Sequence, residues 1–209
     1  MNVRYRYDTN RVIPIPSGMD DDDTGRAWAR TAAVEYAAHI RDEIALDEAA
    51  VSRIENLAAD LVRASRDGRS AALFFLPEPQ IAAPFTVMYS PDRPSRDEQE
   101  DFLWPRSCLL RPVHEMISAE GLGAGSSVAL VQRVQERTFA ERRWLFLGER
   151  GAVAVTLGPV PVPILSIVDP LTETIIDTLA VDEYVPEARG DGARQIADAF
   201  ERDEERWVV

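Results

Sequence analysis

The chain has 209 residues, of which 45% are hydrophobic, so it is long enough to bury a sizeable core without disulfides or metals. Its 36 acidic residues outnumber its 23 basic residues and give a formal net charge of -13. This charge repels phosphate backbones and anionic lipids. It therefore argues against nucleic acid or a membrane surface as the partner and favours a basic protein.

Lysine is absent, because all 23 basic residues are arginines. Mechanisms that need a lysine ε-amine are therefore excluded, namely Schiff-base catalysis, a lysine general base and the lysine of a phosphate loop. The single cysteine, Cys108, cannot form an internal disulfide, and the first residues do not resemble a secretory signal. We therefore expect a reducing, cytoplasmic setting.

The first third of the chain predicts an extended segment followed by two helices. Within the segment 3–16, Val12, Ile13 and Ile15 alternate with prolines, which is typical of an edge strand or a strap. One helix is expected from Thr24 to about residue 40, and a second from about Asp47 to Ala64. Together they predict an αα-hairpin within residues 24–66, which a strand at 71–76 follows.

The middle of the chain predicts an antiparallel sheet. Alternating apolar residues between 126 and 157 indicate a three-stranded meander, with turns near Ala140-Glu141 and at Gly148–Gly151. The other elements expected here are a strand at 85–89, a loop with a short helix over 90–101, an apolar segment at 102–104, and a block at 113–118 that fits either a strand or a helix.

Residues 151–168 carry no charge, which is close to the minimum length of a membrane-spanning helix. Prolines at alternate positions from 159 to 163 argue against such a helix, because each lacks a backbone donor and clashes with the preceding turn. The alternation instead predicts two strands, at 152–157 and 164–168, joined by an extended proline–valine linker.

The C-terminal part predicts two further helices. Asp169 is expected to cap a helix over 169–180, and a charged amphipathic helix is expected over 190–207. Helices, then meander strands, then helices are typical of an α+β fold, here an antiparallel sheet packed against the N-terminal hairpin and the C-terminal helices. An α/β/α sandwich is the alternative. We expect a single globular domain over 1–209, with the hairpin at 24–66, mainly sheet at 70–185 and the last helix at 190–207.

Few side chains are candidates for catalysis. Cys108 and His114 could pair as nucleophile and base, but the leucines at 109 and 110 indicate a buried thiol. The glycine-rich stretch 121–126 indicates a turn between strands, because a β-like run follows it where a phosphate loop would open a helix. Ser126 and its neighbour Ser127 lie outside a nucleophile-elbow pattern. We therefore predict no catalytic residue.

Surface features remain as candidates for binding. The aspartates at 20–23 could hold a hard cation, but consecutive residues point in different directions, which favours a solvated loop that leads into a helix. The two aromatic residues of the last helix either pack on the protein's own sheet or anchor a partner. The candidate binding residues are thus Asp20, Asp21, Asp22, Asp23, Phe200 and Trp207.

These features predict a non-enzymatic, acidic binding protein, such as an adaptor, an assembly component or an inhibitor. Its expected partner is another protein, one with a basic surface. We expect no cofactor and no metal. The alternative is a hydrolase or transferase that uses carboxylates with His114 and either Cys108 or Ser126. A cleft that gathers these groups would favour the alternative. The sequence leaves the oligomeric state open.

Overall fold

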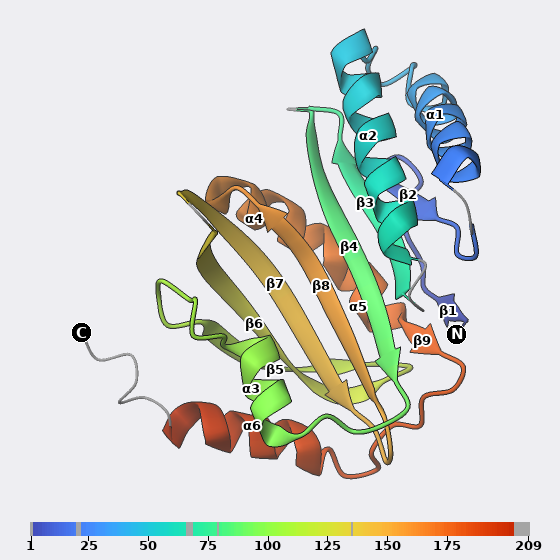
Figure 1. The fold of residues 1–209 in the computed structure, drawn as a ribbon. Coiled ribbons are helices and arrows are strands. Elements are labelled where there is room, and N and C mark those ends of the chain that lie inside the picture. The colour runs from blue at the N-terminus through green and yellow to red at the C-terminus, as the bar shows by residue number, and fades with distance from the viewer. Residues whose placement is uncertain (1, 20–21, 66–68, 79, 135, 203–209) are drawn as a thin grey trace. The chain divides into compact units, whose positions relative to one another are not determined.

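The computed structural model describes residues 2–19, 22–65, 69–78, 80–134 and 136–202, and the fold belongs to the predicted α+β class. An antiparallel sheet has the strand order β2-β3-β4-β8-β7-β6-β5, and β1 pairs with β9 (Figure 1). The strands are β1 (Val3–Arg4), β2 (Val12–Ile15), β3 (Arg69–Leu76), β4 (Ile81–Ser90), β5 (Val113–Ala119), β6 (Gly123–Val134), β7 (Arg137–Leu147), β8 (Ala152–Val160) and β9 (Ala180–Val181). The helices are α1 (Asp22–His39), α2 (Glu48–Ala64), α3 (Arg96–Leu103), α4 (Val162–Val168), the 3-10 segment η2 (Asp169–Thr172), α5 (Glu173–Thr178) and α6 (Asp191–Arg202).

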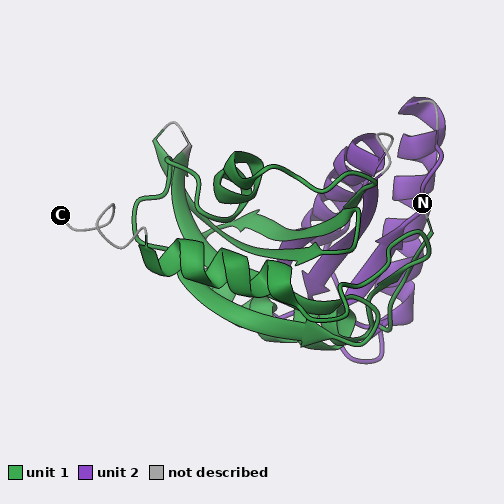
Figure 2. Ribbon diagram, turned by 90° about the horizontal axis from the view of Figure 1, so that it is seen from below, with its two compact units in different colours: residues 1–6, 87–209 green, residues 7–86 purple. Residues whose placement is uncertain are grey.

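The chain divides into two compact units (Figure 2). Unit 1 contains residues 1–6 and 87–209, and unit 2 contains residues 7–86. The boundary falls inside β4, so this strand contributes residues to both units. The single domain expected over residues 1–209 therefore stays a prediction.

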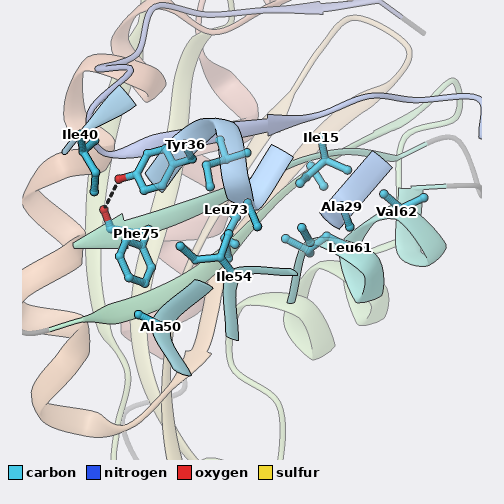
Figure 3. Close-up of a cluster of buried hydrophobic side chains, with 14 residues drawn as sticks. Ile15, Ala29, Tyr36, Ile40, Ala50, Ile54, Leu61, Val62, Leu73 and Phe75 are labelled. Atoms are coloured by element: carbon cyan, nitrogen blue, oxygen red, sulfur yellow. Dashed lines mark hydrogen bonds between the residues drawn. The ribbon is translucent and has the colours of Figure 1, made fainter. Parts of the chain in front are cut away.

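Unit 2 contains the predicted αα-hairpin, formed by α1 and α2. Asp47 caps α2 by accepting a hydrogen bond of 2.7 Å from the backbone N–H of Ala50, as the sequence predicts. The apolar faces of the two helices and the inner face of β3 form one core, in which the Tyr36 hydroxyl donates to the Phe75 carbonyl (Figure 3). β2 pairs with the edge of β3 that faces away from β4 and is the outermost strand of the sheet. This confirms the edge strand expected within residues 3–16.

Helices cover both faces of the sheet in unit 1 (Figure 1). α6 contacts β5, β6 and β7, and α3 contacts β7 on the same face; α4 contacts β7 and β8, and α5 contacts β5, on the other. Alternate residues of β7 separate the two faces, because successive side chains of a strand point to opposite sides. Leu145 and Leu147 pack with α3 and α6, whereas Arg142 and Trp144 lie on the side of η2 and α5. Unit 1 thus has the three-layered arrangement given above as the alternative.

The meander β6-β7-β8 confirms the sheet predicted between residues 126 and 157, but the turn expected near Ala140-Glu141 is wrong. β7 continues through this position, and its pairing with β8 shifts register between Ala140 and Arg142. Two β8 residues, Gly158 and Pro159, stand opposite the single β7 residue there. The polar residues at 141–143 therefore mark an irregular pairing and not a chain reversal.

The strand expected at 164–168 is also wrong, because these residues belong to α4. Pro161 occupies the N-cap and Pro163 the second helical position, where a missing N–H leaves no hydrogen bond unmade and the fixed φ favours the first turn. Leu165 and Val168 are buried at a spacing of three residues, so packing of a helical face overrides the β propensity of this segment.

Asp169 does not cap a helix at its N-terminus, contrary to the expectation. It has helical dihedral angles and follows α4 directly, and η2 and α5 continue the helical path to Thr178. None of the described helices is both long enough and apolar enough to cross a membrane. The uncharged residues 151–168 instead form β8 and α4.

The remaining elements agree with the sequence or settle what it left open. The short helix expected over 90–101 is α3, whose capping box joins Ser95 and Glu98, and it extends into the apolar segment at 102–104. The ambiguous block at 113–118 is the strand β5. The last helix is α6 as far as Arg202, and the rest of the predicted range lies outside the described residues.

Candidate functional site

The acidic run from Asp20 to Asp23 enters α1 in unit 2. Asp22 and Asp23 stand in the first turn of this helix, where negative charge is favourable to the helix dipole. Asp20 and Asp21 lie outside the described residues. Over the part of the chain that is described, there is no group of three or more His, Cys, Asp or Glu side chains with the arrangement of a metal site.

Phe200 is buried in unit 1 and does not form a surface anchor, which corrects that part of the expectation. Its ring makes an edge contact with Trp104 at 5.3 Å and stacks on His114 at 5.0 Å between centroids. The Arg111 guanidinium lies 5.0 Å from the same ring. α6 therefore packs on its own sheet, as the first of the two alternatives predicts. Trp207 lies outside the described residues.

His114 and Ser126 lie on neighbouring strands but are not hydrogen-bonded to each other. His114 pairs with Val128 across β5 and β6, and Ser126 pairs with Met116. The His114 Nε2 and the Ser126 Oγ are buried and have no hydrogen-bond partner within the described ranges. Burial lowers the pKa of His114 below its ordinary value of 6.5, and the Glu115 and Glu201 carboxylates oppose this shift.

Cys108 belongs to a different pairing, since it forms an isolated bridge with Gln132 further along β6. Its side chain is half-buried and is not part of a disulfide. The candidate groups for the alternative enzymatic function are thus spread along the face of the sheet that α3 and α6 cover. They do not line the pocket described next.

A pocket of about 400 Å³ opens on the other face of unit 1. The strands β5 and β7 and the helical segments η2 and α5 form it. The residues that line it are Glu115, Ile117 and Ser118 of β5, Arg142 and Trp144 of β7, and Asp169, Thr172, Glu173, Ile176 and Asp177 of the helical segments. Its volume lies within the range of sites that take small ligands.

Arg142 is the cation in this pocket, and its side chain is only 10% exposed. Its Nη2 donates to the Glu115 carboxylate and, at 2.9 Å, to the Ser127 hydroxyl. Its Nε lies 3.9 Å from Oδ1 of Asp169, which is too far for a hydrogen bond, and has no partner among the residues described. Arg142 and Asp169 therefore form an ion pair without a hydrogen bond, whereas Arg142 and Glu115 are joined by a hydrogen bond.

The pocket carries an excess of negative charge. Glu115, Asp169, Glu173 and Asp177 face a single guanidinium. Burial raises the pKa of Asp169 above its ordinary value; Arg142 lowers it, and the like charges of Glu115 and Glu173 raise it again. Burial and the neighbouring carboxylates thus outweigh the arginine in their effect on the pKa of Asp169.

The edge of the sheet next to this pocket is exposed and apolar. β5 is the last strand in the sheet order, and Val113 and Met116 are 60% and 58% exposed. Leu109 and Leu110, just before the strand, are 42% and 65% exposed. Four of the nine exposed large hydrophobic side chains in the described part of the chain thus lie within residues 109–116.

Sequence reasoning missed both the pocket and this edge. A turn was expected near Ala140-Glu141 and the next strand only from Trp144, so a buried arginine at 142 within a strand was not considered. The signal was nevertheless present, because a charged residue within an aromatic and aliphatic strand needs a buried partner. A search for relatives adds no information: no protein-family model, curated protein or solved structure matches this chain.

Proposed function

We propose that this protein is a non-enzymatic binding protein that recognises an extended, basic segment of another protein by adding it as a strand beside β5. An outer strand presents a row of backbone N–H and C=O groups that a second chain can pair with. The observation that carries the proposal is the exposed edge at β5, with Val113 and Met116 on the surface.

The composition of β5 supports this role. Protective edge strands usually carry several charges or a proline, which prevent pairing with other chains. The seven residues of β5 contain neither proline nor lysine or arginine, and Glu115 is their one acidic residue. Its exposed apolar residues point to both faces of the strand, so they can contact alternate side chains of an added strand.

Charge selects the kind of partner. The carboxylates at the β5 edge and in the adjacent pocket outnumber the arginine there, and the whole chain has a formal charge of -13. Pairing of two β5 edges would bring like charges together, whereas a basic segment would be attracted. The partner that fits is therefore a basic protein, and the proposed setting is the reducing cytoplasm, which a single half-buried cysteine suits.

The test measures the affinity of a fluorescent, capped seven-residue peptide of alternating valine and lysine. We expect the double variant Val113→Lys/Met116→Lys to weaken binding at least fivefold, because it places positive charge on the exposed edge. The matched control is Val34→Lys/Val185→Lys, which adds the same charge at two positions that are each 57% exposed. Equal affinities for the two double variants would contradict strand addition at β5.

A further inference from the structure

We infer that the pocket beside β5 takes a lysine or arginine side chain of the segment added to that strand, and this inference rests on the proposed function. The pocket is lined by Glu115, Ile117 and Ser118 of the same strand. Side chains on one face of an added strand lie next to those on the same face of β5. A residue paired beside Ile117 therefore points toward the pocket.

The lining matches the two parts of a long cationic side chain. Ile117 and Ile176 provide apolar surface for the aliphatic stem, and Trp144 forms an aromatic wall. Glu173 and Asp177 lie one helical turn apart on α5 and are both exposed, so they can contact the charged end. Lysine and arginine bury their stems against apolar surface in this way while their charged groups contact polar ones.

The charge balance of the pocket lining supports a cationic ligand over an anionic one, because four carboxylates stand against the single guanidinium of Arg142. Arg142 is hydrogen-bonded to Glu115, and its Nε lies 3.9 Å from Oδ1 of Asp169, within ion-pair distance but beyond a hydrogen bond. Asp169, Glu173 and Asp177 thus remain as three carboxylates near a guanidinium already bonded to Glu115. An incoming ammonium or guanidinium would lower the repulsion among them.

The experiment compares three capped seven-residue peptides by isothermal titration: valine alternating with lysine, with arginine or with norleucine. We expect the lysine and arginine peptides to bind at least tenfold more tightly than the norleucine peptide. The variant Glu173→Gln/Asp177→Asn should abolish this preference. The control Asp101→Asn/Glu149→Gln removes the same charge from exposed positions outside the pocket and should preserve it.

The outcomes separate this inference from the proposed function. If all three peptides bind equally and protect the β5 amides, strand addition stands and the cation pocket is wrong. If no peptide protects these amides, the proposed function fails, and a titration with n-butylammonium tests the pocket alone. A shift of the Trp144 indole signal that the Glu173→Gln/Asp177→Asn variant abolishes would support the cation site, and its absence would overturn it.

Discussion

At the scale of single residues, the two adjacent serines of β6 have opposite environments. Both are completely buried, but Ser127 accepts a hydrogen bond from Arg142, whereas the Ser126 hydroxyl has no partner among the residues described. A hydrogen bond to a charged group contributes about 1.5–3 kcal/mol, and a buried unpaired hydroxyl costs free energy. The contribution of each serine to stability should therefore differ in sign.

We predict that Ser127→Ala lowers the free energy of unfolding by about 1–3 kcal/mol. Ser126→Ala should leave it unchanged or raise it, since it removes a polar group that lacks a partner. Urea denaturation of the two variants beside the unmodified protein measures both effects. A loss for Ser126→Ala as large as that for Ser127→Ala would show that the two hydroxyls have equivalent surroundings.

Asp169 gives a pH-dependent prediction. Its pKa is raised above 3.8 by burial first, so the folded state holds this proton more tightly than the unfolded state. Stability therefore falls as the pH rises from about 3.8 through the raised pKa, and the loss is complete above it. Asp169→Asn, which cannot ionise, should be more stable than the unmodified protein at pH 7, and this difference should close toward pH 3.8.

The control for this experiment is Asp101→Asn, at an exposed position of α3. Its free energy of unfolding should follow that of the unmodified protein at each pH. If Asp169→Asn is instead less stable at pH 7, the attraction of Arg142 for the Asp169 carboxylate outweighs the cost of its burial.

At the scale of elements, local signals succeeded where one segment carries its own cap and periodicity. α2 has Asp47 as its N-cap and a continuous apolar stripe, and its observed bounds match the prediction. α4 was missed because prolines and β-branched residues favour an extended chain locally, whereas burial of Leu165 and Val168 is a tertiary effect. The meander was predicted but not the register shift beside Arg142, which depends on Gly158 and Pro159 of the partner strand.

The pairing of β6 with β7 depends on a glycine. A Cβ at Gly125 would lie 2.5 Å from Cδ1 of Phe146 and 2.9 Å from the Leu145 carbonyl oxygen. We predict that Gly125→Ala costs about 1–3 kcal/mol through overpacking. Thermal unfolding of Gly125→Ala, Phe146→Leu and the double variant measures the coupling, and the double variant should be more stable than the sum of the two single losses implies. Strict additivity would show that Phe146 does not limit the space at this position.

At the scale of the whole molecule, composition predicted the sign of the charge but not its location. The acidic excess of the sequence argued for a basic partner, and the pocket in unit 1 contains such an excess. Its residues come from β5, β7, η2 and α5, and they are brought together only when the strands pair. No local pattern in the sequence links Glu115 with Asp169, so this site could not be predicted before the topology was known.

Burial of Phe200 decides between the two alternatives that the sequence left open for the aromatic residues of the last helix. Phe200 has the spacing of a surface stripe on α6, but Trp104 and His114 cover it. Four exposed apolar residues lie instead within 109–116, a range that overlaps the block at 113–118 where the sequence fits both a strand and a helix. Amphipathic patterns show that a face is apolar, but the fold determines whether that face is covered.

The central claim is that unit 1 adds a basic segment to β5, and amide hydrogen exchange with the lysine–valine peptide tests it most directly. The account predicts that the peptide slows exchange at backbone amides of residues 113–119, and that Val113→Lys/Met116→Lys removes this protection while Val34→Lys/Val185→Lys retains it. Unchanged exchange along β5 in the presence of saturating peptide, or protection confined to other strands, would contradict the account.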